Sequence, residues 1–402
     1  MNPAKVRTFS ARYLAVGLAG YCAFINLYSP QSILPLLSEE FHASAAEVST
    51  IITVSTLAVA VTAPFTGAVA DVLGRKRVIV AAMFVLVIPT LMVGLATTLP
   101  QLILWRAVQG LVLPPIFAVT VAYIGDEWTP SEATTAAGIY SSGSSLGGFS
   151  GRLVTGFLAD LVGWRAGFTA LAAIAFAGAI AVAILLPHER RFVRSQGLLA
   201  SSRQMLAHFR NGQLLATYAV GFGVLFNFIC TFTFVSFHLA AAPYNLSASW
   251  LGAIFVVYVV GSALTPWTGW AVGRFGRRRL TVRIIAIWVA GIALTLAPSL
   301  PLIIAGLAIC AGCGLICQAI STGYVTITAK AGRSSAVGLY VTSFYVGGSF
   351  GAALGGVTWT IGGWPACVAL VVAILMIMAA IVIFAWARRV PAAPGVPPIE
   401  SP

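Results

Sequence analysis

The feature that most constrains this chain is a series of apolar stretches, each about 20 residues long, which is the length that crosses a membrane as a helix. Because 59% of the 402 residues are hydrophobic and only 8% are charged, the chain lacks the polar surface of a water-soluble fold. Long continuous apolar runs also exclude a membrane barrel, whose strands alternate apolar and polar residues. The sequence therefore predicts an all-α integral membrane protein with twelve spans. These spans are 13–37, 47–70, 78–98, 101–124, 133–159, 166–187, 213–238, 250–272, 282–299, 301–327, 335–361 and 364–387.

The placement of the basic residues predicts the orientation of these spans. With both termini in the cytoplasm, 20 of the 23 Lys and Arg residues fall on the cytoplasmic side. Only Arg165 falls outside, and Arg106 and Arg152 lie within spans. This asymmetry follows the positive-inside rule, so the net charge of +13 needs no nucleic-acid partner. We expect a multi-pass protein of a bacterial inner membrane, with the lipid bilayer as its surroundings and both termini cytoplasmic.

An internal repeat divides the chain into two halves. Residues 62–77 recur as residues 264–279, and both copies contain a proline, a Thr-Gly pair and a basic run. Glycine pairs and a Gly-Trp pair in residues 138–164 recur 200 residues later. The repeat predicts two six-helix bundles of parallel topology, with a solute site between them near the middle of the membrane. The expected domains are a tail 1–12, a bundle 13–187, a linker 188–212, a bundle 213–388 and a tail 389–402.

Two motifs resemble those of the major facilitator superfamily, in particular its twelve-helix drug:proton antiporter and sugar-efflux branch. The run from Gly67 through Asp71 to Arg77 is similar to the signature between helices 2 and 3, and the run from Leu102 through Arg106 to Gly110 resembles the helix 4 motif of proton antiporters. The chain departs from the family pattern at two places. Val72 stands where the family usually has a basic residue, and helix 5 lacks the usual proline. The resemblance implies the major facilitator fold, alternating access, a proton gradient as the driving force, no cofactor and a monomer.

The first motif and its second copy form a predicted conformational latch on the cytoplasmic side. If the family packing holds, the Asp71 carboxylate lies at the start of helix 11, near Ser334 and Ser335, where a helix N-terminus stabilises a negative charge. Asp126 or Glu127 is expected to pair with Arg75 or Arg77, and a solvated rim is the alternative. The latch residues are Gly67, Asp71, Gly74, Arg75, Arg77, Asp126, Gly276 and Arg277.

Arg106 and Arg152 are the strongest candidates for a role in transport, together with Gln109 and Asp71. A guanidinium group inside a span is costly unless it meets water, polar groups or a ligand, and neither arginine recurs in the second half. Two such cations favour an anionic or sugar-like solute over a permanently cationic one. The alternative is a structural arginine that is capped by backbone carbonyls of a helix 1 bent at Pro30 and Pro35.

Carboxylates and histidines are expected only at helix ends, in loops or in tails. Proton coupling would then use an acid at the membrane rim, arginine hydration or the ionisation of the solute. Aromatic and amide residues on helices 1, 7, 10 and 11 are the candidates for the solute cavity, with ordinary packing as the alternative. They are Asn26, Tyr28, Gln31, Phe226, Asn227, Phe232, Gln318, Tyr324, Tyr340 and Tyr345.

The function that these observations predict is secondary active transport, as proton-coupled efflux of a small organic solute such as a drug, a sugar or a metabolite. Metabolite uptake by a symporter or uniporter is the alternative within transport, and a polytopic receptor or enzyme is the alternative outside it. We expect no enzymatic activity, because no cluster of His, Asp and Ser shares one depth. We also expect no metal site, because Cys310, Cys313 and Cys317 share a helix face without a nearby His or carboxylate.

Overall fold

The structure is a computed structural model that describes residues 3–189, 208–329 and 333–386, and every regular element in these ranges is helical. The predicted tail 389–402 and most of the predicted linker 188–212 lie outside these ranges. The helices of the first half are α1 (Pro3–Leu27), η1 (Ser29–Ser32), α2 (Leu34–Glu40), α3 (Ala45–Leu73), α4 (Arg75–Gly94), α5 (Leu99–Glu127), α6 (Pro130–Val162) and α7 (Trp164–Leu185). Those of the second half are α9 (Gly212–Ala240), α10 (Ala248–Ile254), α11 (Val257–Leu264), η2 (Thr265–Trp267), α12 (Thr268–Phe275), α13 (Arg277–Leu294), α14 (Leu300–Thr328) and α15 (Arg333–Ala385).

These elements make up the twelve predicted membrane crossings within the described residues. Two of the crossings are joined in α15, whose backbone leaves the helical conformation at Gly362 and Gly363. Gly363 has a φ of +61°, which favours glycine because a side chain would clash with the backbone. The predicted boundary between residues 361 and 364 falls at this kink.

The first crossing is interrupted where the sequence places its prolines. The helix α1 ends at Leu27, a 3-10 turn spans Ser29–Ser32, and α2 resumes at Leu34. Proline removes a backbone hydrogen-bond donor and clashes with the preceding turn, so Pro30 and Pro35 end one helix and begin the next. The interruption leaves backbone carbonyls at the end of α1 free to accept hydrogen bonds from other helices.

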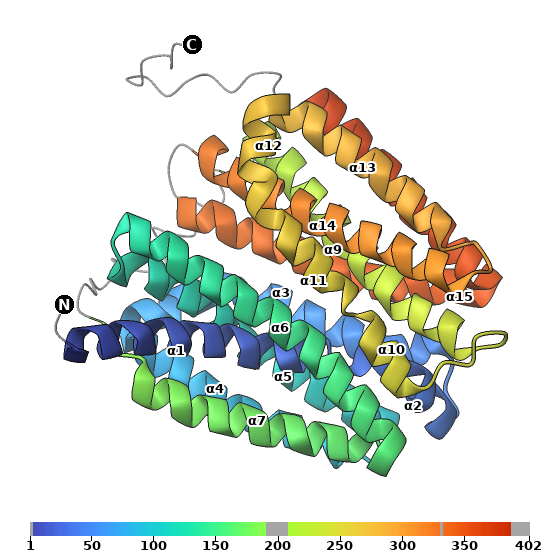
Figure 1. Ribbon diagram of the computed structural model, residues 1–402, viewed down its shortest axis with the longest axis horizontal. Helices are drawn as coiled ribbons and strands as arrows, with labels where there is room; N and C mark the ends of the chain where they lie inside the picture. Colours follow the sequence, from blue (N-terminus) through green and yellow to red (C-terminus); the bar gives the residue numbers. More distant parts are fainter. Residues whose placement is uncertain (1–2, 190–207, 330–332, 387–402) are drawn as a thin grey trace.

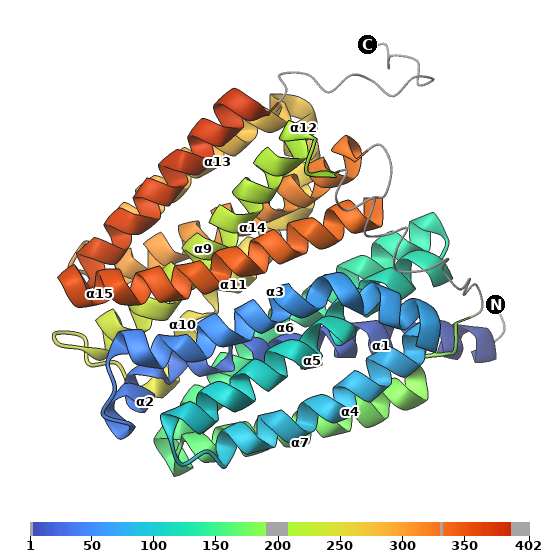
Figure 2. The same cartoon turned by 180° about the vertical axis from the view of Figure 1, so that it is seen from behind.

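The two halves lie side by side, with the blue-to-green half packed against the yellow-to-red half (Figures 1 and 2). Three helix pairs carry most of the interface: α3 packs against α15, and α6 packs against both α10 and α11. We call the membrane face that carries Arg75 and Arg277, at the starts of α4 and α13, the basic face. The face that carries Glu47 and Asp160, near the start of α3 and the end of α6, is the opposite face.

Candidate functional site

Arg106 is fully buried within the first half and is held by uncharged oxygen atoms. Its Nη1 donates to the carbonyl of Asn26 at 2.9 Å and to Oε1 of Gln109 at 2.6 Å. Its Nη2 donates to the carbonyl of Leu27. The two carbonyls lie at the end of α1, where the interruption of the first crossing frees them. Arg106 therefore takes the structural arrangement that the sequence offered as an alternative, a cation capped by the bent first crossing.

Gln109 and Asn26 belong to the same buried network, which joins α1, α4 and α5. Gln109 donates through Nε2 to the hydroxyl of Thr90 at 2.8 Å, and that hydroxyl lies 2.9 Å from Oδ1 of Asn26. Among the described residues, Nε of Arg106 is the network's one donor without a partner. A buried polar network that is satisfied in this way fixes the relative positions of its helices.

Arg152 lies at the interface of the two halves, inside a cage of aromatic rings. It belongs to α6, is 3% exposed, and its guanidinium carbon is 5.1 Å from the ring centre of Tyr28 in the first half. Phe255 and Tyr258 of the second half approach to 4.3 Å and 5.2 Å. A cation over aromatic faces is stabilised by their negative potential, more strongly where water is absent. Two of the three rings belong to the opposite half, so the cage opens if the halves separate.

The hydrogen bonds that Arg152 donates stay within the first half, and Gln31 extends them across the interface. Its Nε and Nη2 both donate to Oε1 of Gln31, at 2.8 and 2.6 Å, and its Nη1 donates to the carbonyl of Gly148 at 2.6 Å. Gln31 in turn donates through Nε2 to the hydroxyl of Thr233 in the second half, at 3.0 Å. In the described part of the chain, neither Arg152 nor Arg106 has a carboxylate within ion-pair distance.

The halves touch from the opposite face to the middle of the membrane. Their backbones approach closely at the opposite face, and side chains make the contacts nearer the middle. A Cβ atom added at Gly156 would lie 2.2 Å from the carbonyl oxygen of Ala248, and one added at Gly356 would lie 2.9 Å from Cα of Ala46. The two contacts are repeat mates, since α10 corresponds to the start of α3 and α15 to α6. Further contacts towards the middle join Ser49 to Ala352, Thr56 to Ser349, Ser145 to Ser262 and Phe117 to Tyr345. We call this set of contacts the gate.

Asp160 completes the gate at its outer edge. Its Oδ2 accepts a hydrogen bond from the backbone N–H of Ser249 at 2.9 Å, and Ser247 and Ala248 contribute further hydrogen bonds to the carboxylate. Partial burial raises the pKa of Asp160, but these hydrogen bonds outweigh it, and the pKa lies below that of an ordinary aspartate. The start of α3, by contrast, is capped from within its own half, since Glu47 and Ser44 form a capping box.

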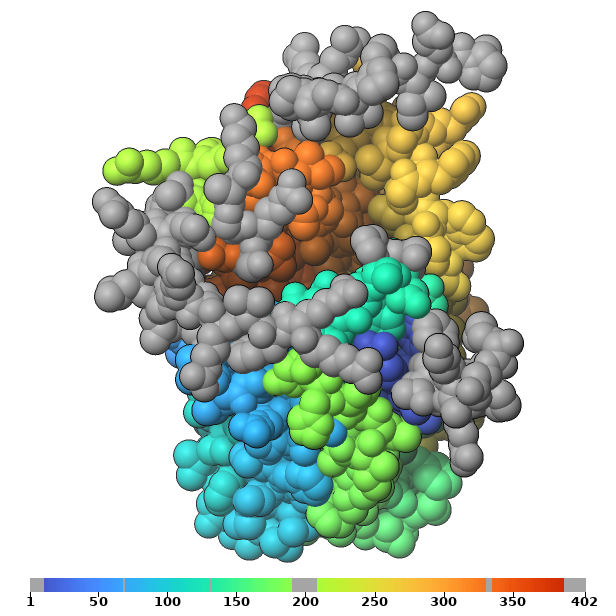
Figure 3. Space-filling model, turned by 90° about the vertical axis from the view of Figure 1, so that its left-hand side faces the viewer, coloured from blue at the N-terminus to red at the C-terminus, as the bar shows by residue number. Residues whose placement is uncertain are grey.

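The basic face is open between the halves, where the opposite face is closed. Seen from the basic face, a hollow separates the teal start of α6 from the orange residues of the second half (Figure 3). The contacts of the gate all lie beyond this hollow, towards the opposite face. The structure is therefore that of a two-bundle protein whose halves touch at the opposite face and are separated by a hollow at the basic face.

The predicted latch residues lie on the basic face, and two of them form a close ion pair. Arg75 binds Asp126 at 2.6 Å, one of the pairings that the sequence offers, while Asp71 is 3.8 Å from the same guanidinium. Gly74 has a φ of +92°, and Arg77 is exposed. In the second copy, Gly276 has a φ of +76° and Arg277 lies over the ring of Tyr324. Gly67 is exposed, and a Cβ atom added there would meet open space.

The predicted contact of Asp71 with the start of α15 involves Ser334, whose side chain lies outside the described residues. What the structure does show for Asp71 is the contact with Arg75 within the first half. The Asp71 carboxylate is thus engaged, though at long range, with the first half's own basic run.

The other predicted cavity residues fall into three places. Phe232 packs against Tyr258, with ring centres 4.6 Å apart, beside the Arg152 cage, and Tyr345 stacks on Phe117 across the interface. Asn227 and Phe226 point into the second half, where Asn227 lies 3.4 Å from the sulfur of Met378. The remaining residues lie nearer the basic face: Tyr324 donates to Gln213, Tyr340 stacks on Phe344, and Gln318 is half-buried in α14.

Several residues of the two arginine networks and of the gate were absent from the sequence-based candidates. Thr90 and Thr233 complete the two arginine networks, Phe255 and Tyr258 form the Arg152 cage, and Asp160 caps α10. Only Asp160 carried a signal in the sequence, as an acidic residue directly after the predicted span 133–159, while α10, which begins at Ala248, has no acidic residue in its own first turn.

Comparisons with known proteins agree with this architecture. The model of the Major Facilitator Superfamily matches residues 16–264 and 220–402. The inner membrane transport protein YnfM of Escherichia coli (strain K12) is 32% identical over 368 residues, which are 90% of this chain and 88% of that protein. A bacterial homologue of the human lysosomal transporter Spinster, solved in an inward-facing and unoccupied conformation, covers 96% of this chain and 97% of its own with a TM-score of 0.73 and 18% identity. The crystal structure of a mutant of the nucleoside transporter NupG covers 93% of this chain and 100% of its own, with a TM-score of 0.75 and 15% identity.

Proposed function

This chain belongs to the major facilitator superfamily and is a multi-pass membrane transporter, and we propose that it exports a small organic solute from the cytoplasm in exchange for protons. The observation that carries the proposal is the asymmetry of the interface. The gate closes the opposite face through Gly156, Gly356 and Asp160, while the basic face is hollowed between the halves. A carrier that works by alternating access needs such a state, and a second state in which the closed and open faces are exchanged.

The distribution of charge supports the assignment of the basic face to the cytoplasm. The starts of α4 and α13 carry the runs 75–77 and 277–279, and basic residues are retained on the cytoplasmic side of bacterial membrane proteins. In this orientation the hollow receives solute from the cytoplasm, and the gate faces the periplasm. The structure then represents the loading state of an exporter.

Arg152 supports an anionic group on the solute. It is a buried cation whose acceptors are uncharged oxygen atoms, so its charge is stabilised only by dipoles and aromatic rings. A solute carboxylate, sulfonate or phosphate that displaces Gln31 would form a charge-assisted, two-point contact with the guanidinium group. Because Phe255 and Tyr258 hold the same cation from the other half while the gate is closed, such a solute and the closed gate compete for one side chain.

Arg106 is better suited to holding the scaffold than to binding solute. Its hydrogen bonds are made within the first half, to the end of α1 and to Gln109, and none of them crosses to the second half. We assign it the role of fixing the broken first crossing, on which Tyr28 and Gln31 approach Arg152.

The experiment that tests the proposal is transport into proteoliposomes with an imposed pH gradient. Counterflow of a set of organic anions and their uncharged analogues identifies the solute class, and a pH-sensitive dye inside the vesicles reports proton exchange. We expect Arg152→Gln to lower anion flux by about tenfold, the value of one lost charge-assisted hydrogen bond, while sparing an uncharged analogue. Arg165→Gln is the matched control, because Arg165 is an exposed arginine that pairs with Glu40 on the opposite face.

The outcomes separate the parts of the proposal. Equal loss of anion and neutral flux in a folded Arg152→Gln protein would show that the arginine is structural. Solute flux without any change in internal pH would refute proton exchange while leaving the carrier itself intact. Accumulation driven only in the inward direction would reverse the assignment of efflux to uptake.

A further inference from the structure

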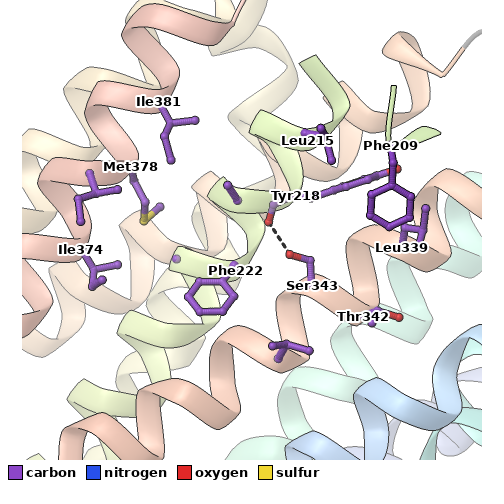
Figure 4. Close-up of a pocket in the computed structure, with 14 residues that line it drawn as sticks. Phe209, Leu215, Tyr218, Phe222, Leu339, Thr342, Ser343, Ile374, Met378 and Ile381 are labelled. Atoms are coloured by element: carbon purple, nitrogen blue, oxygen red, sulfur yellow. Dashed lines mark hydrogen bonds between the residues drawn. The ribbon is translucent and has the colours of Figure 1, made fainter. Parts of the chain in front are cut away.

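A cavity of about 550 Å³ lies inside the second half, away from the Arg152 cage. Its walls come from α9, from both arms of α15 and from Phe209, which precedes α9 (Figure 4). A volume of this size is within the range of pockets that bind small molecules in proteins. Nearly all of its lining is apolar, with Met378, Phe222 and Ile374 on its walls.

The cavity lies where the two repeats differ in the size of their side chains. In the first half, Gly143 of α6 contacts Gly17 of α1 so closely that an added Cβ would lie 2.2 Å from the carbonyl oxygen of Gly17. In the second half, the equivalent contact is made by Ser343, whose hydroxyl donates to the carbonyl of Tyr218 at 2.9 Å. Replacing two glycines by a serine and a tyrosine removes a direct backbone contact between the helices. The space next to it is lined by Ala219, whose repeat mate is the larger Leu18.

Two polar groups in this apolar cavity lack partners among the described residues. The hydroxyl of Tyr218 and the Oγ1 atom of Thr342 are both buried without a hydrogen bond. Tyr218 as a whole is only 5% exposed. A buried hydroxyl without a partner costs free energy, which a hydrogen bond to an acceptor atom would recover. Two of the residues that line this apolar volume, Tyr218 and Thr342, thus carry a hydroxyl group without a partner among the described residues.

The mouth of the cavity has the features of a lipid contact. Phe209 and Ile377 at its edge are 52% and 55% exposed, on a surface that faces the membrane. Arg210, next to Phe209, is also exposed at the basic face. Tyr218 lies six residues into α9, which places its backbone about 9 Å below the helix start. The order from surface to interior is therefore a cation, a hydroxyl and an apolar volume.

We propose that this cavity binds one acyl chain of a phospholipid from the leaflet on the basic face. The chain fills the volume between α9 and α15, the ester carbonyl accepts a hydrogen bond from Tyr218 or Thr342, and the phosphate lies against Arg210. The same order of phosphate, ester and chain occurs in every phospholipid, and the basic face attracts those with an anionic headgroup. The site is separate from the solute path, so this proposal does not depend on the direction or the cargo of transport.

The test uses the full-length protein in nanodiscs that contain phosphatidylglycerol with a photoreactive group in its acyl chain. After illumination, we expect lipid adducts on the cavity-lining residues of α9 and α15. Ala219→Trp fills the cavity and should lower the adduct yield by at least about tenfold. Tyr218→Phe keeps the ring but removes one hydrogen bond, and should lower lipid retention by about fivefold in native mass spectrometry.

Leu18→Trp is the matched control, because it adds a ring of the same size at the repeat-related position of the first half and should leave the adducts unchanged. Thermal unfolding checks that each variant is folded. If Ala219→Trp does not fold, Thr342→Val, which removes a hydroxyl group without changing the shape of the side chain, should lower lipid retention as Tyr218→Phe does. An unchanged adduct yield in folded Ala219→Trp protein, or adducts only outside the cavity, would overturn the site. Retention that neither Tyr218→Phe nor Arg210→Gln alters would overturn the phospholipid as its occupant.

Discussion

The capping of α10 by Asp160 gives the most direct test of how the gate is held shut. Asp160 belongs to the first half, and the N–H group that it binds, that of Ser249, belongs to the second half. Opening of the opposite face must therefore break this hydrogen bond, whereas it leaves the capping box of Glu47 intact. Asp160→Asn keeps the size of the side chain and removes the charge.

The expected magnitude follows from the contacts of the carboxylate. A charged acceptor at a helix start is stabilised by its hydrogen bonds and by the helix dipole, and partial exposure reduces both effects. We estimate a loss of about 1 kcal/mol from the closed gate, which is roughly a fivefold shift of the equilibrium towards the open gate. The lowered pKa of Asp160 determines how its stabilisation of the closed gate depends on pH. Its contribution is complete above the ordinary aspartate pKa of about 3.9 and is lost only as the pH falls through the lowered value.

The assay is the distance between spin labels at Val162 and Trp250, both exposed and each close to one side of the gate. Wild-type protein at neutral pH should give a single short distance, and Asp160→Asn should add a longer component. Glu47→Gln removes a similar charge from a cap within one half and should leave the distance unchanged. The reasoning fails if Glu47→Gln lengthens the distance as much as Asp160→Asn does, or if Asp160→Asn has no effect at neutral pH.

Two further predictions concern the gate and the first-half network. Gly156→Leu should hold the gate open, because even its Cβ would lie 2.2 Å from the backbone of Ala248; the same spin-label distance reports it, and Gly138→Leu, on the same helix with open space around it, should have no effect. Arg106→Leu should destabilise the protein by about 3 kcal/mol, because it leaves the carbonyls at the end of α1 buried without donors. Thermal unfolding in detergent measures this loss, and wild-type stability of the variant would contradict it.

The number, position and interruptions of the helices could be predicted because they depend on local properties of the sequence. Apolar runs fix the spans, Pro30 and Pro35 end the first helix early, and Gly363 permits the turn between the last two spans. The repeat also predicted which helices are equivalent, because matching glycines recur at matching depths. The membrane reduces the possibilities further, since each span has to satisfy its backbone hydrogen bonds within a helix.

The partners of the buried arginines could be predicted only in part. Gln109 lies three residues after Arg106 on the same helix face, so its contact is readable from spacing. The carbonyls of Asn26 and Leu27 are not, because a backbone acceptor carries no mark in the sequence. The aromatic cage of Arg152 was missed for a related reason: it depends on how far the halves have closed, which is a property of one conformation.

Asp71 and Asp160, at opposite faces of the first half, suggest how the closed and open faces are balanced. Asp160 caps a helix of the second half in this state, while Asp71, at the basic face, lies 3.8 Å from the guanidinium of Arg75 in its own half. Arg75 is the closer partner of Asp126, at 2.6 Å, so Asp71 can leave it at little cost. When the halves rock, Asp160 must lose its helix start just as Asp71 can gain one at α15. We propose that each state keeps one charged cap between the halves in this way, so that neither state is strongly favoured until solute binds between them.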